Sequence, residues 1–445
     1  MRNSNLILHH IIYRGLYFFS VLLLNICIAR FFAAEKSGQI FYTVNNLTLI
    51  LLLVSVSLES GTAYYISAGS LETSAIARFC FIWATAASLV AVAVWWSVLY
   101  FSHSVYLGNT GFLFASFLFI AGVLYTSYFT ALFYAKKEFG LPNKILFFVN
   151  ILLVVILILG KFYLSIRDHF ILIYFSSFFL QGLLMNIFFF RQQYSTGRPF
   201  MPSNQILKKI MLYSLAALVA NLIYFLVNRV DYWFVEYFCS AKDLGNYIQA
   251  SKLGQMLLIL PGILGSTLFP IFSSQTKTGN TFELAATIRT LLWINSGICI
   301  MIICFGWYVF PLVFGVSFKN MYLLFLFLIP GILAITMNYP MAAWFSAGKR
   351  IGINTRGGLI ALLVICAGDL FLLPRYGVRA APVISSIGFM CFYFYTIYQY
   401  RREYAVPWKD FVIFRKSDLA ILRESITSKI RNLSSEDTII PNSST

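Results

Sequence analysis

Long runs of apolar residues separated by short polar turns recur along the whole chain. Most of these runs reach the roughly 18 residues that a helix needs to cross the hydrocarbon of a bilayer. The pattern therefore predicts an all-α polytopic membrane protein with about twelve transmembrane helices. The predicted helices cover residues 11–32, 40–67, 77–102, 111–135, 145–165, 170–190, 209–236, 245–273, 284–314, 320–347, 357–373 and 380–400.

The composition agrees with this pattern. Hydrophobic residues make up 60% of the chain and charged residues 11%, against about 45 to 50% and about 25% in ordinary soluble domains. These values exclude a water-soluble globular protein. The net charge of +17 does not indicate nucleic-acid binding, because most of the 33 Lys and Arg residues lie in short loops between apolar runs.

The distribution of the basic residues predicts how the chain is inserted. If the N-terminus lies inside, 23 Lys and Arg residues fall on the inner side and eight on the outer side. An excess of basic residues in short loops marks the cytoplasmic side of a membrane protein. We therefore expect both termini in the cytoplasm.

A polar segment at 191–208, which carries Gly197, Pro199 and Pro202, divides the predicted helices into six and six. A shift of 207 residues also gives a weak internal match of 31–67 with 238–274. We therefore predict two six-helix lobes in parallel repeat, an arrangement that places a substrate site between lobes. The predicted domains are an N-terminal lobe at 1–190, a cytoplasmic linker at 191–208, a C-terminal lobe at 209–402 and a cytoplasmic tail at 403–445.

The tail is too polar to span a membrane. Apolar residues at three- and four-residue spacing over 419–430, with basic residues around them, predict a basic amphipathic helix that attaches to an anionic surface. In the eighth predicted helix, Pro261 and Pro270 remove backbone hydrogen bonds, so we expect that helix to bend.

Motifs of hydrolases and nucleotide-binding enzymes do not occur in the sequence. The chain has no GxxxxGK[ST], no HExxH and no GxSxG, and its seven cysteines are scattered without a CxxC pair. The predicted outer loops are all short, which leaves no room for an extracytoplasmic catalytic domain. We therefore expect a protein that is not an enzyme and that uses no cofactor and no metal site.

Ionisable residues inside the apolar runs are the candidate site residues, because a charge in the middle of a bilayer is costly without a partner or a cavity. One interpretation is structural, with an ion pair between Asp231 and Lys252 and with long basic side chains reaching the interface. The functional interpretation is that the cations line an inter-lobe cavity and attract an anionic headgroup, while the carboxylates couple transport to an ion or hold helices together. The candidate cations are Arg14, Arg30, Arg229 and Lys252, and the candidate carboxylates are Glu59, Asp231 and Asp369.

Two stretches resemble a known family. Asp231, the segment Asp243–Tyr247 and the later Pro261 resemble the start of the second lobe in bacterial oligosaccharide flippases of the polysaccharide biosynthesis type. The run from Leu372 to Ala381 resembles the link between the last two helices of that family. This family, within the multidrug/oligosaccharidyl-lipid/polysaccharide exporter superfamily, usually carries an amide where Asp369 stands and a glycine where Arg379 stands.

The resemblance implies that the chain flips an undecaprenyl-diphosphate-linked oligosaccharide, such as an O-antigen repeat unit in lipopolysaccharide biosynthesis, across the bacterial inner membrane by alternating access. The lipid-linked oligosaccharide, membrane lipids and other polysaccharide-assembly proteins are then the candidate partners. The first predicted helix fits an anionic substrate, because its only ionisable residues are Arg14 and Arg30. Two alternatives stay open, a small-molecule antiporter of the same superfamily and a membrane-embedded polysaccharide polymerase.

Overall fold

The computed structural model describes most of the chain. The predicted tail helix at 419–430, the residue Pro270 and residues 193–200 of the predicted linker lie outside the described residues. The described residues are 2–67, 73–101, 110–136, 138–160, 169–192, 201–265, 280–348, 350–404, 407, 409–413 and 415.

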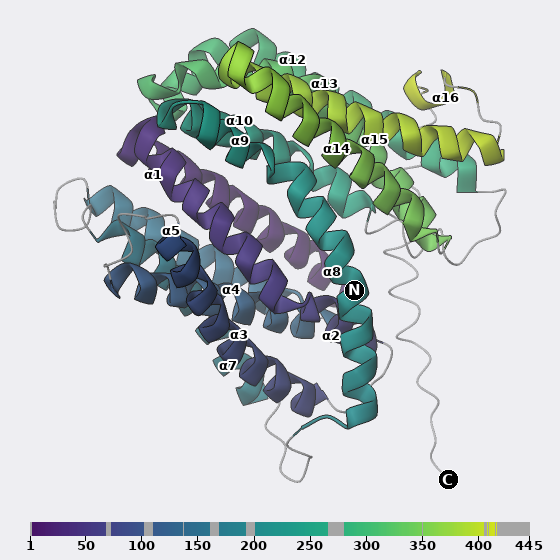
Figure 1. Ribbon diagram of the computed structural model, residues 1–445. Coiled ribbons are helices and arrows are strands. Elements are labelled where there is room, and N and C mark those ends of the chain that lie inside the picture. Colours follow the sequence, from purple (N-terminus) through teal and green to yellow (C-terminus); the bar gives the residue numbers. More distant parts are fainter. Residues whose placement is uncertain are drawn as a thin grey trace. The chain divides into compact units, whose positions relative to one another are not determined.

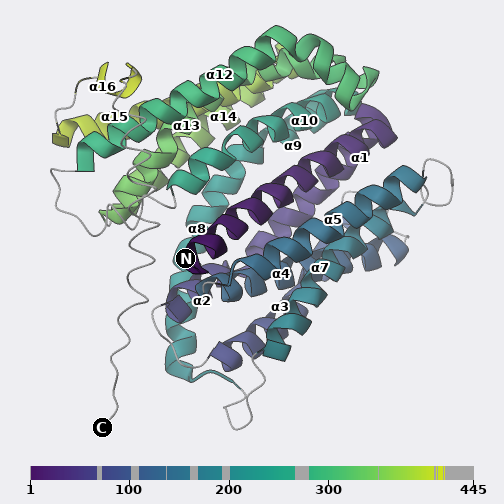
Figure 2. The same cartoon turned by 180° about the vertical axis from the view of Figure 1, so that it is seen from behind.

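Within these ranges the chain is helical and contains no strand. The longer helices are visible in Figures 1 and 2. They are α1 (Arg2–Ser55), α2 (Leu58–Ser67), α3 (Thr73–Phe101), α4 (Thr110–Ala135), α5 (Gly140–Gly160), α7 (Phe170–Gln192), α8 (Asn204–Arg229), α9 (Asp231–Phe238), α10 (Ala241–Leu257), α12 (Asn280–Phe314), α13 (Lys319–Ala347), α14 (Ile351–Tyr376) and α15 (Ala380–Tyr404). Short elements are η1 (Val316–Phe318), η2 (Gly377–Arg379) and α16 (Lys409–Val412).

The apolar helices confirm a multi-pass membrane protein. Ten stretches of the described chain are long and apolar enough to span a bilayer. Two of these stretches, Tyr13–Ser55 and Ile351–Tyr404, each contain two of the predicted helices. The ten stretches therefore account for the twelve helices that the sequence predicts.

Helix α1 and the junction between α1 and α2 contain breaks that the apolar pattern does not show. Ala33 interrupts α1 with a φ of 56° and a ψ of −178°, a conformation that is accessible almost only to glycine. Val56 and Ser57 have φ values of 53° and 50° and end the helix at Ser55. The predicted helix at 40–67 is therefore two helices, because left-handed residues cannot continue a right-handed one.

Side chains from other helices satisfy the backbone groups that this second break exposes. The indole N–H of Trp83 donates to the Val54 carbonyl over 3.3 Å, and the hydroxyl of Tyr128 donates to the Ser55 carbonyl over 3.0 Å. Unpaired carbonyl groups are costly in a membrane interior, and such side-chain donors stabilise a broken helix there.

The internal contacts divide the chain into two compact units. Unit 1 comprises Met1–Ser4, Phe32–Gln39 and Ile223–Thr445, and unit 2 comprises Asn5–Phe31 and Ile40–Leu222. In unit 2, α4 packs closely along α7. The helices cross where Gly182 meets Gly122, since a Cβ on Gly182 would lie 2.6 Å from the Gly122 carbonyl oxygen. Small residues at such crossings allow helix backbones in membranes to approach closely.

In unit 1, α12, α13, α14 and α15 lie side by side (Figure 1) and form one packed layer. The start of the tail also belongs to this core. Phe411 of α16 has no exposed surface and lies in a cluster with Trp344 and Tyr400. The buried Arg289 donates a hydrogen bond to the Asp410 carbonyl, and the Trp293 indole donates to the Val412 carbonyl over 3.1 Å. Residues 409–413 are thus docked to the helices.

Candidate functional site: a polar pocket around Asp231

The helix ends near residue 230 place a carboxylate inside unit 1. Helix α8 ends at Arg229, and α9 starts with Asp231 in its first turn. A negative charge is favourable at that end of a helix because the backbone N–H groups point towards it. The next helix, α10, is capped by Ser240, whose hydroxyl accepts from the Asp243 backbone N–H over 3.2 Å. These helix ends position α9 and α10 against each other.

Two hydroxyl groups hold one oxygen of the Asp231 carboxylate. Tyr247 of α10 donates to Asp231 Oδ2, and Ser385 of α15 donates to the same atom over 3.0 Å. The two hydroxyl oxygens are themselves 3.2 Å apart. The other oxygen, Oδ1, accepts no hydrogen bond from the described residues, although Asp231 is only 3% exposed. A buried carboxylate oxygen of this kind is able to accept a hydrogen bond from a ligand or to bind a cation.

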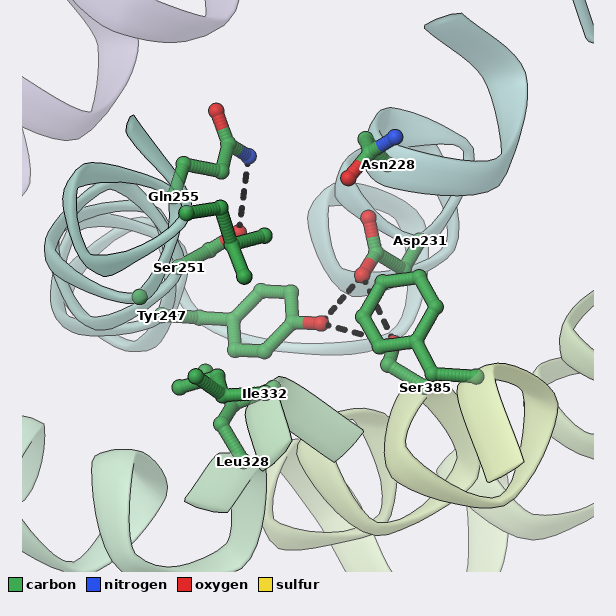
Figure 3. Close-up of a pocket in the computed structure, with 11 residues that line it drawn as sticks. Asn228, Asp231, Tyr247, Ser251, Gln255, Leu328, Ile332 and Ser385 are labelled. Carbon is green, nitrogen blue, oxygen red and sulfur yellow. Dashed lines mark hydrogen bonds between the residues drawn. The ribbon is translucent and has the colours of Figure 1, made fainter. Parts of the chain in front are cut away.

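Asp231 borders a small pocket within unit 1 (Figure 3). In addition to Asp231 of α9, polar side chains from α8, α10 and α15 line this pocket. Apolar side chains from α13 and α15 line it as well. Ser251 accepts from the Tyr232 hydroxyl over 3.0 Å and from the Gln255 amide over 3.3 Å. The lining residues are Asn228, Asp231, Tyr247, Ser251, Gly254, Gln255, Leu258, Leu328, Ile332, Ser385 and Phe389.

Unit 1 contains a second buried carboxylate. Asp369 of α14 has no exposed surface, and neither of its carboxylate oxygens accepts a hydrogen bond from the described residues. Helix α14 packs against α9, which carries Asp231. A buried carboxylate without a hydrogen-bond donor can be neutralised by a proton or a monovalent cation. No group of three or more His, Cys, Asp or Glu side chains that could hold a metal ion occurs among the described residues.

Two of the predicted cations lie on the helices that form the pocket. The guanidinium of Arg229 lies 5.7 Å from the centre of the Phe225 ring. Lys252 lies on α10. Hydroxyl groups of Tyr247 and Ser385 donate to the Asp231 carboxylate. The structural interpretation of an Asp231–Lys252 ion pair stays a prediction.

The remaining predicted site residues lie in unit 2. Arg14 of α1 is half-buried, with its guanidinium 6.0 Å from the centre of the Phe18 ring. Arg30 is exposed and precedes the break at Ala33. Glu59 is half-buried in the first turn of α2, directly after the break at 56–57. The structure therefore brings Arg229, Asp231, Lys252 and Asp369 into one unit, and Arg14, Arg30 and Glu59 into the other.

Several pocket residues were not among the predicted site residues, because they are uncharged. On α10, Tyr247, Ser251 and Gln255 recur every four residues and share one face of the helix. The stretch that contains them is the least apolar of the ten spanning stretches. A polar stripe along a membrane helix is the sequence signal that would have found them.

The comparisons with known proteins agree with this architecture. Residues 141–323 match the family described as "Polysaccharide biosynthesis protein". No curated protein matches the sequence.

Three solved structures illustrate the fold. The lipid II flippase MurJ in an inward closed conformation has 13% identity and a TM-score of 0.66, over 98% of this chain and 99% of that one. An inward-facing multidrug resistance MATE family transporter of the MOP superfamily has 12% identity and a TM-score of 0.64, over 88% and 94%. A MOP superfamily transporter from Pyrococcus furiosus has 12% identity and a TM-score of 0.63, over 91% and 96%. The match over residues 141–323 confirms the predicted resemblance to polysaccharide biosynthesis proteins, and the solved structures show that the chain shares their fold.

Proposed function

We propose that the protein is a flippase that moves an undecaprenyl-diphosphate-linked oligosaccharide, such as an O-antigen repeat unit, across the bacterial inner membrane by alternating access. The family match supports polysaccharide assembly as the process. The likeness to MurJ, a lipid II flippase, supports a lipid-linked substrate. The same comparisons favour a transporter over the polymerase alternative, since the matched solved structures described above are transporters.

The observation that carries the proposal is that two cations, Arg229 and Lys252, lie within the spanning helices of unit 1. A cation inside a membrane-spanning helix is costly and often marks a substrate pathway. A diphosphate group carries the negative charge that such cations attract. Arg14 and Arg30 remain candidates for contacts with the same headgroup from unit 2.

We assign the driving step to the carboxylates Asp231 and Asp369. The burial of both side chains, and the oxygens in each that accept no hydrogen bond from the described residues, suit the uptake of a proton or a monovalent cation during each transport cycle. Glu59 is the weaker candidate for this role, because it is less buried than either aspartate. The distribution of basic residues supports a cytoplasmic position for both termini.

The experiment is export of lipid-linked repeat units in cells that carry Arg229→Ala, Lys252→Ala or the double change Lys252→Ala/Asp231→Asn at matched protein levels. A charge-assisted contact to phosphate is worth about 1.5 to 3 kcal/mol, so each single change should reduce export roughly ten- to hundredfold. Lys242→Ala is the matched control, because Lys242 is an exposed lysine on the same helix. Normal export in both single variants, or full recovery in the double variant, would contradict the proposed diphosphate site.

A small-molecule antiporter is the second candidate, and the unsatisfied Asp231 Oδ1 in the pocket favours it. A buried carboxylate in a pocket would attract a cationic compound. Cells that overproduce the protein should then become resistant to cationic drugs, and Asp231→Asn should remove that resistance. The flippase proposal predicts no change in drug resistance.

A further inference from the structure

Helix α12 is longer than a bilayer requires. It runs for 35 residues from Asn280 to Phe314, which is roughly 52 Å at the rise of an α-helix. The hydrocarbon core of a bilayer is about 30 Å thick, and about 20 residues cross it. Counted back from the end of the helix at Phe314, about 20 residues end near Asn295. The first part of α12 therefore extends beyond the hydrocarbon.

The burial of the side chains changes at the same point of α12. Every residue from 284 to 291 is buried, so other parts of unit 1 surround this end of the helix. From Trp293 onwards, exposed apolar side chains recur along the helix, including Ile294, Ile300 and Met301. Exposed apolar side chains on a membrane-spanning helix face lipid. The two boundaries agree, and α12 leaves the lipid near Trp293.

The docked segment 409–413 crosses α12 at this boundary. Figures 1 and 2 show α16 at the end of the layer that α12, α13 and α15 form. Arg289 donates to the Asp410 carbonyl, and the Trp293 indole N–H donates to the Val412 carbonyl over 3.1 Å. A tryptophan with a bonded N–H and an exposed ring is typical of the membrane–water interface. The charge of Arg289 agrees with this position, because a guanidinium is costly inside the hydrocarbon.

The outward side of the docked segment is apolar. Val412 and Ile413 are 48% and 54% exposed, whereas Phe411 has no exposed surface. Trp293, which bonds to Val412, is also half exposed. So much exposed apolar surface on a short segment is unfavourable in water, but at a bilayer interface it is removed from water. These side chains continue the lipid-facing surface of α12.

The charges around the docked segment suit an anionic surface. Arg402 in the last turn of α15 and Arg415 after α16 are both exposed. The acidic side chains of Glu403 and Asp410 lie in ion pairs with arginines, so their negative charge is neutralised locally. Basic residues outnumber acidic ones over 401–416. Basic residues next to a membrane attract anionic lipid headgroups.

We propose that Trp293, Val412 and Ile413 form an interfacial surface that inserts into the headgroup region of the bilayer, with anionic phospholipids as its partner. The buried Phe411 and the hydrogen bond from Arg289 fix this surface to the helices of unit 1. The surface therefore keeps its position with or without a bound lipid. It belongs to unit 1 alone and does not depend on which substrate the protein transports.

The first test measures the depth of the docked segment in the membrane. The full-length, cysteine-free protein with Ile413→Cys carries a bimane fluorophore at that position and is placed in nanodiscs of phosphatidylcholine and phosphatidylglycerol. Quenching is compared for a nitroxide on the lipid headgroup, a nitroxide near the end of the acyl chain, and iodide in water. We expect the headgroup nitroxide to quench the Ile413→Cys probe most strongly.

Ile300→Cys is the matched control for depth. Ile300 is similarly exposed, at 58%, but it lies about 10 Å further along α12 than Trp293. The acyl-chain nitroxide should quench a probe at this position most strongly.

The second test measures which lipid gathers around the docked segment. Quenching of the Ile413→Cys probe is compared between phosphatidylglycerol and phosphatidylcholine that carry the same nitroxide on the acyl chain, close to the headgroup. One basic residue near an anionic surface strengthens attraction about fivefold, so we expect labelled phosphatidylglycerol to be enriched about two- to fivefold in dilute buffer. Salt at about 1 M should remove the enrichment.

Charge variants identify the residues that attract the lipid. Arg402→Gln/Arg415→Gln should remove most of the enrichment at the Ile413→Cys probe. Lys319→Gln is the matched control, because Lys319 is an exposed lysine at the other end of the same helix layer. It should leave the enrichment unchanged.

Two kinds of outcome would overturn the proposal. Strongest quenching of the Ile413→Cys probe by iodide would place the segment in water, and strongest quenching by the acyl-chain nitroxide would place it in the hydrocarbon. Equal quenching by the two labelled lipids in dilute buffer, or full enrichment in Arg402→Gln/Arg415→Gln, would exclude the anionic partner.

Discussion

Tyr247 on α10 donates its hydroxyl hydrogen to the carboxylate of Asp231 on α9. Ser385 from α15 completes the arrangement, so that three helices of unit 1 meet at one carboxylate oxygen. Hydrogen bonds between membrane helices stabilise their packing because no water competes for the groups. The contact therefore links the packing of α9, α10 and α15 to the hydrogen bonding of the Asp231 carboxylate.

Tyr247→Phe should lower both stability and transport. The change removes one of two donors to Asp231 Oδ2 and keeps the ring. Interhelical hydrogen bonds in membranes contribute about 0.6 kcal/mol on average and up to about 1.7, so we expect a small decrease in the unfolding temperature and a severalfold loss of export. Tyr232→Phe is the control, since it removes a buried hydroxyl that contacts Ser251 and not Asp231. Equal export in the two variants would show that the Asp231 contact has no special role.

Asp369→Asn should separate stability from transport. Both Asp369 oxygens are buried without hydrogen-bond donors among the described residues, so a neutral amide of the same shape removes a buried carboxylate without breaking a contact. We expect an unchanged or higher unfolding temperature together with reduced cation-dependent export. Asp231→Asn should instead lower the unfolding temperature, because it weakens two hydroxyl contacts. Normal export by Asp369→Asn would make this carboxylate dispensable for coupling.

Gly245→Ala should disrupt folding of unit 1. A Cβ at Gly245 would lie 1.8 Å from the Ala34 carbonyl oxygen, and that oxygen belongs to backbone that cannot rotate away. Separating the two backbones would also strain the 3.1 Å hydrogen bond from the Ala34 N–H to Ser317 Oγ. We expect little detergent-stable protein. Gly297→Ala, where nothing lies within 4 Å of the added methyl, should be neutral or slightly stabilising because alanine favours the helix.

Cysteine labelling tests the topology. In a cysteine-free background, a cysteine at Asn320 should react with an impermeant thiol reagent in intact spheroplasts. A cysteine at Asn204 should react only after lysis, because the positive-inside pattern places it in the cytoplasm. Labelling of the Asn204 position from outside would reverse the assigned orientation.

The helices were predictable from sequence because each needs an apolar run long enough to cross the bilayer, which is a local property. The breaks at Ala33 and at residues 56–57 were not predictable from sequence. Alanine and valine disfavour positive φ values, so only the surrounding structure, including the Trp83 and Tyr128 donors, accounts for them.

The interruption of the helix near Pro261 was predictable from the sequence only in part. Its missing N–H predicts an interruption of the eighth predicted helix, and α10 indeed ends at Leu257 before the helix resumes at 259. The Leu257 carbonyl, which Pro261 cannot bond, accepts from the Asn295 amide over 3.4 Å. The partner on α12 could not be predicted, because it depends on tertiary packing.

The site was predictable only where it is charged. A charge inside an apolar run stands out in the sequence, so Asp231, which lines the pocket, was among the predicted site residues. Tyr247 and Ser385 were not found because neither residue type is unusual in a membrane helix. Their role depends on three helices meeting, which no local pattern encodes.

The start of the tail contributes to the stability of unit 1. From sequence alone, the segment after residue 403 could contribute only surface attachment, but the structure places Phe411 in the core without exposed surface. Truncation of a buried Phe to Ala typically costs about 3 to 5 kcal/mol, so Phe411→Ala should clearly lower the unfolding temperature of the purified protein. Val412→Ala is the matched control, because Val412 is 48% exposed and its contact to Trp293 uses only the backbone.

Truncation after Glu403 should destabilise the protein at least as much as Phe411→Ala, whereas truncation after Arg415 keeps the docked segment and should retain stability. Equal unfolding temperatures for Phe411→Ala and Val412→Ala would show that the docked segment adds nothing to the fold.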